Sequence, residues 1–191
     1  MERNERINLY MSEAPKLIEE NKDLTEFLLN EGFFDAPAST KYHGVYAGGL
    51  FDHSAMVYKE LKTLTEKLKL RWARQESVFI VGMFHDLCKY DQYIEVPGSY
   101  IDTGGNSNIV TPVGTHYEYN KNTLLKGHGS KSVMLLSRFI PLTEEEMLCI
   151  KYHMGPYETD EWNEFDKAIR KYPNVYFAHA ADMIASKIDD V

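Results

Sequence analysis

Apolar residues recur at helical spacing along most of the chain. Val57, Leu61 and Leu64 fall on one face of residues 50–69 and predict an amphipathic helix, with His53 one turn earlier on that face. Residues 74–89 predict a second helix, which is apolar nearly all round and therefore expected to be buried. Further helices are predicted at residues 12–31, 130–139, 143–153, 162–172 and 174–189, the one at 143–153 opening on a capping box of Thr143 and Glu146.

Residues 94–124 break this pattern. Glycine and proline recur there among tyrosine, asparagine, threonine and serine, which predicts a long loop that can include a hairpin. A loop of this length in a compact domain is usually functional or disordered. The expected fold is all-α: one domain over residues 1–191 with six or seven packed helices, an N-terminal helical extension over about 1–40 and this insertion.

The composition limits the class of protein. A chain of 191 residues with 43% hydrophobic and 26% charged residues is typical of one globular domain. No apolar run approaches the ~20 residues that cross a bilayer, and the first residues lack the apolar core of a signal peptide. Two cysteines are too few for a disulfide framework, so we expect a cytoplasmic protein without a membrane span.

The net charge bears on partners. A formal charge of -8 is a poor basis for gripping long nucleic acid, where a basic surface is expected. It is compatible with a small nucleotide, because bound cations can invert the local charge of an acidic pocket.

Ligand-type residues lie at inward positions of three predicted helices. His85 and Asp86 end the most apolar helix, and a carboxylate is rarely buried unless it is paired or binds a metal. Alone, this dipeptide is better explained as a helix-end histidine and a solvated aspartate. His53 and Asp182 change that balance, since each also lies in or beside the apolar face of a helix. Nitrogen and carboxylate ligands suit a divalent transition metal.

Three motifs carry a resemblance to a known family. The strings Tyr42-His-Gly-Val-Tyr-Ala-Gly-Gly-Leu-Phe-Asp-His53 and Phe84-His-Asp-Leu-Cys-Lys89, followed by Ala181-Asp182, resemble the HD-domain metal-dependent phosphohydrolase superfamily. The Gly-Gly-Leu-x-x-His form is similar to the branch that includes 3′–5′ exoribonucleases. The resemblance extends from about residue 42 to the end of the chain, and it is more specific for fold and metal site than for substrate.

The resemblance implies a ligand set. One metal would be held by His53, His85, Asp86 and Asp182, and a second by His128 and His153 with Asp86 as the bridge. The expected cofactor is therefore a divalent transition metal, as two ions of Mn, Fe, Ni, Co or Zn. Without a metal, His128 would be a turn histidine and His153 a cap at a helix C-terminus.

The sequence departs from the family pattern at two positions. Cys88 stands where glycine is usual, and Met154 stands where many relatives have a second histidine; neither change removes a predicted ligand. Cys88 itself is interpreted as a small buried hydrophobe.

Two lysines are candidates for phosphate binding. Lys89 follows Asp86 by three residues and resembles the family lysine that contacts phosphate, so Asp86 and Lys89 are the predicted catalytic pair. Lys131 is a second candidate for substrate binding, although a solvated lysine explains it equally well. His179 is expected to support the site rather than ligate, and His43 and His116 to line the pocket at most.

The resulting hypothesis is metal-assisted hydrolysis of a nucleotide or short nucleotidyl phosphoester. The expected partner is thus a small-molecule phosphoester or nucleotide. Two alternatives remain: a di-iron oxygenase with the same ligand set, and a non-catalytic nucleotide-binding module. The sequence fixes neither the metal, the substrate nor the oligomeric state.

Overall fold

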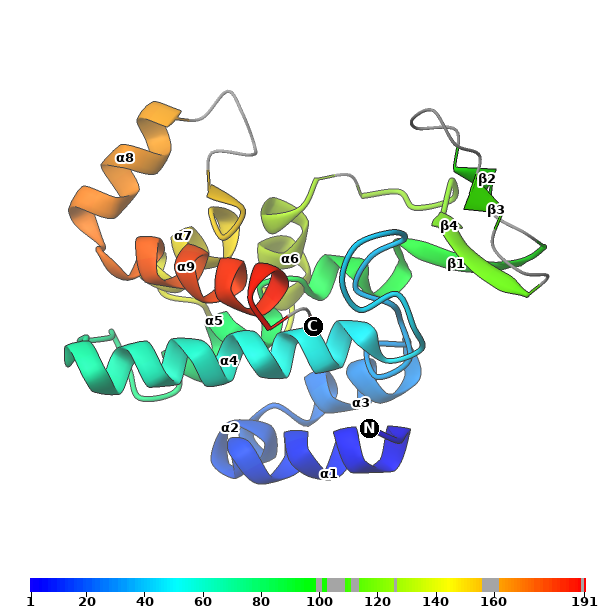
Figure 1. Ribbon diagram of the computed structural model, residues 1–191. Helices are drawn as coiled ribbons and strands as arrows, with labels where there is room; N and C mark the ends of the chain where they lie inside the picture. Colours follow the sequence, from blue (N-terminus) through cyan, green and yellow to red (C-terminus); the bar gives the residue numbers. More distant parts are fainter. Residues whose placement is uncertain (99–100, 103–108, 111–113, 126, 156–161, 190) are drawn as a thin grey trace.

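The computed structural model describes residues 1–98, 101–102, 109–110, 114–125, 127–155, 162–189 and 191 (Figure 1). These residues are mainly helical, in agreement with the predicted class. The helices are α1 (Arg3–Glu13), α2 (Pro15–Glu20), α3 (Lys22–Asn30), α4 (Gly49–Leu68), α5 (Ser77–Phe84), the 3-10 helix η1 (Leu87–Asp91), α6 (Gly129–Leu136), α7 (Glu144–Lys151), α8 (Trp162–Lys171) and α9 (Asn174–Lys187). No helix in these ranges is both long and apolar enough to cross a membrane.

The N-terminal region differs from the prediction. A single helix over 12–31 was wrong, because the backbone leaves the helical region at Ala14 (φ -140°) and at Asn21 (φ -128°). Pro15 starts α2 at a position where its missing N–H is not needed. The Asn21 side chain donates to the Leu17 carbonyl oxygen at 2.7 Å and so competes with the helical backbone bonds. These breaks raise the number of α-helices in the described chain to nine, against six or seven expected.

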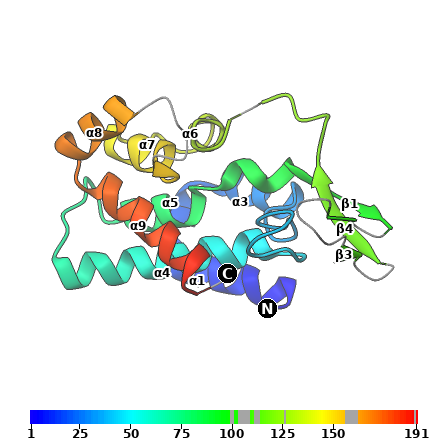
Figure 2. The ribbon, with the colours of Figure 1, turned by 45° about the horizontal axis from the view of Figure 1, so that its top comes forward.

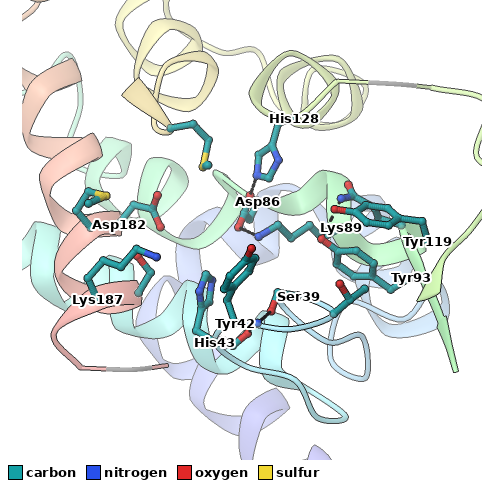
Figure 3. A pocket seen from close by; sticks show the side chains of 15 residues that line it. Ser39, Tyr42, His43, Asp86, Lys89, Tyr93, Tyr119, His128, Asp182 and Lys187 are labelled. Atoms are coloured by element: carbon teal, nitrogen blue, oxygen red, sulfur yellow. Dashed lines mark hydrogen bonds and ion pairs between the residues drawn. The ribbon is translucent and has the colours of Figure 1, made fainter. Parts of the chain in front are cut away.

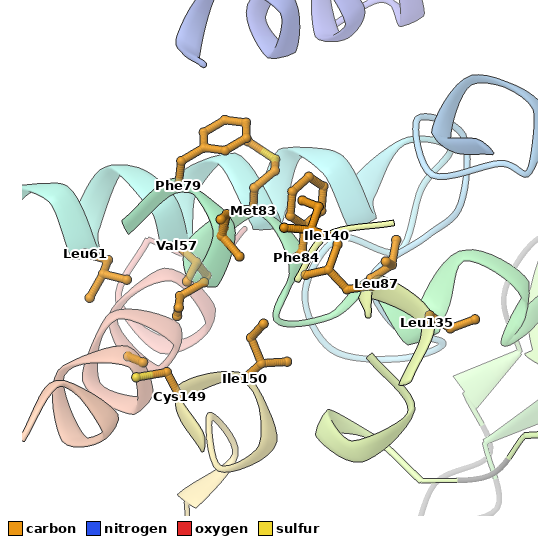
Figure 4. Packing of buried hydrophobic residues seen from close by; sticks show 14 of the residues in the cluster. Val57, Leu61, Phe79, Met83, Phe84, Leu87, Leu135, Ile140, Cys149 and Ile150 are labelled. Carbon is orange, nitrogen blue, oxygen red and sulfur yellow. The ribbon is translucent and has the colours of Figure 1, made fainter. Parts of the chain in front are cut away.

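Three helices form the centre of the molecule. Helix α4 packs against both α5 and α9, and Figures 1 and 2 show α4 and α9 side by side. Val57 and Leu61 of α4 belong to the same buried core as Phe79 and Met83 of α5 (Figure 4). Gly82 permits this close approach, because a Cβ atom there would lie 2.4 Å from the Cα atom of Tyr58.

Helix α5 ends earlier than predicted. The expected helix over 74–89 is replaced by α5, which stops at Phe84, and by the separate helix η1. Between them Asp86 has φ -106° and ψ 19°, and its carbonyl accepts the Lys89 N–H at 3.0 Å in a tighter turn. This turn keeps the side chains of Asp86 and Lys89 on one side of the chain.

The predicted capping box starts α7. The Thr143 hydroxyl accepts from the Glu146 N–H at 3.2 Å, and Glu146 accepts from the Thr143 N–H at 2.9 Å. The buried Glu146 carboxylate also accepts two bonds from Arg74 and one from Ser77, each at 2.8 Å. The cap therefore also fastens α7 to the start of α5.

The predicted insertion contains a hairpin. Strands β1 (Tyr93–Pro97) and β4 (Thr115–Tyr119) pair antiparallel, with Tyr93 opposite Tyr119, and β2 (Ile101–Asp102) pairs with β3 (Ile109–Val110). In Figures 1 and 2 the hairpin projects from the end of η1, at the opposite end of the molecule from α8. Residues 99–100, 103–108 and 111–113 of the predicted loop lie outside the described residues.

Candidate metal centre

Three central helices bring four predicted ligands together. The Nε2 atom of His53 in α4 lies 3.1 Å from Asp182 Oδ1 in α9 and 3.2 Å from His85 Nε2 at the end of α5. Asp86 Oδ2 lies 3.5 Å from His85 Nε2 and 3.8 Å from His53 Nε2. All four residues are buried, so their donor atoms enclose one small space.

Two more histidines approach Asp86 from the other side. His128, which precedes α6, places Nε2 2.5 Å from Asp86 Oδ1, and His153, just after α7, places Nε2 3.3 Å from the same oxygen. His153 is buried, whereas the His128 side chain is 21% exposed and faces the adjoining cavity (Figure 3). The structure thus brings together all six predicted ligands, with Asp86 between the two groups.

Backbone carbonyls orient three of the imidazoles. The Nδ1 atoms of His53, His85 and His153 lie 2.8, 2.8 and 2.7 Å from the carbonyl oxygens of Val191, Gly82 and Ile150. A carbonyl only accepts, so each Nδ1 carries a proton, and a ring in its neutral form has its lone pair on Nε2, toward the centre. This is the tautomer that a metal requires.

The Nε2 atoms crowd one another at the centre. With a proton on each Nδ1, two neutral rings would place lone pairs 3.2 Å apart at the Nε2 atoms of His53 and His85. Within the described part of the chain, the buried Nε2 atom of His153 has no hydrogen-bond partner, although an Asp86 oxygen lies 3.3 Å away. A cation among these atoms would remove the repulsion, so the buried cluster has the chemistry of a site that can hold a metal ion.

The charges of the cluster match that role. Burial favours a protonated Asp86, but Lys89, His128 and His85 outweigh it and hold the pKa of this carboxyl well below its usual value. His53, His85 and His153 likewise lower the pKa of Asp182, against the effect of burial. Burial lowers the pKa of His85. Ionised carboxylates and a neutral imidazole are the states in which these groups bind metals.

Lys89 completes the inner wall of the cavity. Its ammonium lies 2.6 Å from Asp86 Oδ2, and the side chain is only 7% exposed. Burial opposes the charge, but Asp86 raises the pKa of this lysine above its usual value. A fixed positive charge therefore stands beside the cluster.

Lys131 is placed differently. Its buried ammonium pairs with Asp91 Oδ1 at 2.6 Å and lies 5.7 Å from the centre of the Tyr90 ring. Lys131 lines a neighbouring hollow with Gly127 and Asn120, and the structure does not bring it to the cavity beside Asp86. The partner Asp91, which the sequence analysis did not consider, accounts for its burial.

Cys88 lies closer to the cluster than expected. It is buried as predicted, yet its sulfur lies within 4.8 Å of ligand atoms of Asp86 and His128, so these three residues could also hold an ion. Burial raises the pKa of the Cys88 thiol to about 12. The replacement of the usual glycine at this position was the one sequence signal for this second group.

His179 contacts the backbone of His153. Its Nδ1 atom lies 2.7 Å from the carbonyl oxygen of His153, next to the bond that orients the His153 ring. Gly155 packs beside it: a Cβ atom there would lie 2.7 Å from the His179 ring. His179 therefore fixes the backbone that carries His153.

A cavity of about 370 Å³ opens onto the cluster. Tyr93 and Tyr119 stand on one side with ring centres 5.2 Å apart, and Tyr42 and His43 stand on the other (Figure 3). Burial lowers the pKa of His43 to about 4, with His53 and Lys89 adding to the effect. His116 contacts Glu118 on β4 and is not part of this wall.

Comparison with family models, curated proteins and solved structures finds no match for this chain. The resemblance to the HD-domain superfamily therefore remains a prediction from the motifs. The geometry supports the coarser statement, that a mainly helical chain carries a buried histidine and aspartate cluster able to hold a metal ion.

Proposed function

We propose that this chain is a metal-dependent phosphoester hydrolase of the HD-domain type, acting on a nucleotide or a short nucleotidyl phosphoester. The observation that carries the proposal is the combination of inward Nε2 lone pairs with a buried lysine, Lys89, at the edge of the same cavity. The lone pairs call for a cation, and the lysine adds a positive charge where an anionic substrate would enter.

The donor set divides around Asp86. His53, His85, Asp86 and Asp182 would hold one ion, and Asp86, His128 and His153 would hold the second. Divalent cations at such a site supply Lewis acidity toward phosphoryl oxygens and lower the pKa of water. The Nδ1 contacts with backbone carbonyls keep the ligand rings in place before substrate binds.

Lys89 is the residue assigned to the phosphoryl group. In the free protein its ammonium compensates Asp86; beside a cation-loaded cluster it would donate to the phosphoryl oxygens, on which negative charge develops during hydrolysis. Its near-complete burial removes competing water and strengthens this interaction.

The cavity supports a small substrate with an aromatic group. Its volume of about 370 Å³ is at the lower end of the range for small-molecule sites. The paired rings of Tyr93 and Tyr119 offer a surface on which a base can stack, within the same cavity as Lys89. With the formal charge of -8, this favours nucleotides or short oligonucleotides over long nucleic acid.

The proposal is tested by a hydrolysis screen. Metal-free protein is loaded with Mn²⁺, Co²⁺ or Ni²⁺, and its action on bis(p-nitrophenyl) phosphate and a nucleotide panel is measured without O₂. We expect metal-dependent release of product and none from the metal-free protein. Absence of hydrolysis with every metal would contradict the proposal. O₂ consumption by the iron-loaded protein with an organic substrate would then identify an oxygenase, and nucleotide binding alone a non-catalytic module.

A further inference from the structure

His43 is the one cavity residue whose polar atoms have no explanation in the site described so far. Its ring lies against His53, with centres 4.6 Å apart and planes tilted by 37°. Both ring nitrogens are buried, and neither has a hydrogen-bond partner among the residues that the structure describes. All seven histidines of the chain lie in its described part, and each of the other six has a polar partner for at least one ring nitrogen.

An unpaired imidazole at this place is energetically unfavourable. A buried polar group without a partner loses its hydrogen bonds to water and gains none in return, and here two such atoms belong to one ring. Native structures keep few such groups, and those that persist need an explanation such as a ligand.

The backbone holds His43 where it is. The Ser39 hydroxyl donates to the His43 carbonyl oxygen at 2.8 Å and accepts from the Tyr42 N–H at 2.9 Å. The Ala38 N–H donates to the Gly44 carbonyl oxygen at 2.9 Å. Gly44 has φ +59°, and a Cβ atom on it would lie 2.7 Å from the Ala38 Cβ atom. The loop is thus tied on both sides of His43, so the ring is preorganised.

We propose that His43 is a substrate-contacting residue whose ring N–H donates a hydrogen bond to an oxygen of the phosphoryl group. The inference rests on the proposed function, since it takes its ligand class from there. Figure 3 shows His43 and Lys89 reaching the same cavity from different elements, His43 from the loop before α4 and Lys89 from η1. An anion held between them would satisfy the ring that the protein leaves unpaired. In this role His43 contacts the phosphoryl group and leaves the metal to the histidines and aspartates around Asp86.

Two substitutions separate this role from a structural one. His43→Phe keeps an aromatic ring against His53 and removes both nitrogens, whereas His43→Gln keeps an N–H donor. His116→Ala is the matched control, because His116 is a histidine of β4 outside this cavity.

The readout is binding of inorganic phosphate to the Co²⁺-loaded protein, followed by the visible Co²⁺ spectrum, with metal content from elemental analysis. For His43→Phe we expect unchanged metal content and a Kd for phosphate raised about tenfold or more, the effect of losing one hydrogen bond to a charged group. His43→Gln should recover part of the affinity, and His116→Ala should match the unaltered protein. A parallel titration with a nucleoside monophosphate shows whether the same loss applies to an esterified phosphate.

Other results would overturn the inference. Unchanged phosphate affinity in His43→Phe would make the ring a packing residue, and loss of Co²⁺ would make it part of the metal site. No binding of phosphate by the unaltered loaded protein would show that the ligand class is wrong. Phosphate binding that depends on His43 in a protein that hydrolyses no phosphoester would instead refute the proposed function while upholding this contact.

Discussion

Two buried carboxylates in this molecule have opposite surroundings. Glu146 at the start of α7 accepts hydrogen bonds from Arg74, from Ser77 and from the Thr143 N–H, so its charge is compensated entirely by donors of the protein. Asp86 has one fixed cation, Lys89, and otherwise faces imidazoles, two of which direct lone pairs toward the same centre. Both carboxylates are fully or almost fully buried.

The difference shows how a structural acid is distinguished from a ligand. Burial and a lowered pKa are common to both residues, so neither property identifies function. What separates them is whether the surrounding atoms are donors or acceptors. Hydrogen-bond donors around a carboxylate, as at Glu146, satisfy its charge without a ligand. Acceptor atoms that face one another, as around Asp86, are satisfied only when a cation lies between them.

Removing each carboxylate should therefore have different consequences, and the largest effect is expected at Asp86. Asp86→Ala should abolish both metal loading and phosphoester hydrolysis, because this residue contacts both halves of the cluster. Elemental analysis and a bis(p-nitrophenyl) phosphate assay measure the two losses. Glu146→Gln, the matched control, should retain metal and turnover. Normal metal content in Asp86→Ala would remove Asp86 from the proposed bridge.

The positive partner of Asp86 can be tested separately. Lys89→Met keeps most of the buried stem and removes the charge, so turnover should fall by ~10²–10³ with metal content near that of the unaltered protein. Steady-state kinetics of the metal-loaded variant give the ratio. Lys167→Met, at an exposed lysine of α8, serves as the control. Full activity of Lys89→Met would leave the lysine as no more than the counter-ion of Asp86.

Metal binding to the cluster around Asp86 should raise the free energy of unfolding. A metal present at one hundred times its Kd adds about 2.7 kcal/mol per site to the free energy of unfolding. We expect this increment for the unaltered protein and for Glu146→Gln, and a clearly smaller one for Asp182→Ala, which lacks the oxygen 3.1 Å from His53. Urea denaturation with and without Mn²⁺ measures it. An equal increment in all three proteins would place the metal elsewhere.

The contribution of Glu146 to the stability of the fold should depend on pH. Burial opposes the ionised form of Glu146, but Arg74, Thr143 and Ser77 outweigh it and lower its pKa below 4.5. Glu146 therefore binds a proton more readily in the unfolded chain than in the folded protein. Its contribution to stability is present above about pH 4.5 and is lost as the pH falls through the pKa that Glu146 has in the folded protein.

Glu146→Gln should accordingly cost about 1–3 kcal/mol at pH 7, and less as the pH approaches 3. Chemical denaturation at a series of pH values provides the comparison. Glu144→Gln, at an exposed residue of the same helix, should have a much smaller effect at every pH. A difference that stays constant down to pH 3 would mean that Glu146 is not ionised in the folded protein.

Periodicity predicted much of this architecture. The apolar face of α4 and the capping box of α7 follow the sequence, because each depends on neighbours within a few residues. The hairpin in the insertion was expected from its turn residues, but its register, with Tyr93 opposite Tyr119, depends on distant pairing. The single helix over 12–31 was wrong because Asn21 and Pro15 act locally against an otherwise helical pattern. The single-domain boundaries stay a prediction.

The sequence predicted which side chains form the cluster, but not the contacts that hold them in place. The motifs named the six side chains that the structure brings together, and their role as ligands stays a prediction. Long-range partners were out of reach: Asp91 beside Lys131, the carbonyl oxygens behind each imidazole, and the loop bonds that hold His43. Such contacts depend on how elements pack, and no spacing in the sequence encodes them.

Gly82 has two roles where α4 and α5 pack together. The same residue lets the two backbones approach and offers the carbonyl oxygen that orients His85. The spacing of the two helices therefore helps to set the 3.2 Å distance between the His53 and His85 nitrogens. Preference among ions of different radius would then depend in part on helix spacing. Moving a helix is then one way to change the ionic radius that this centre accepts.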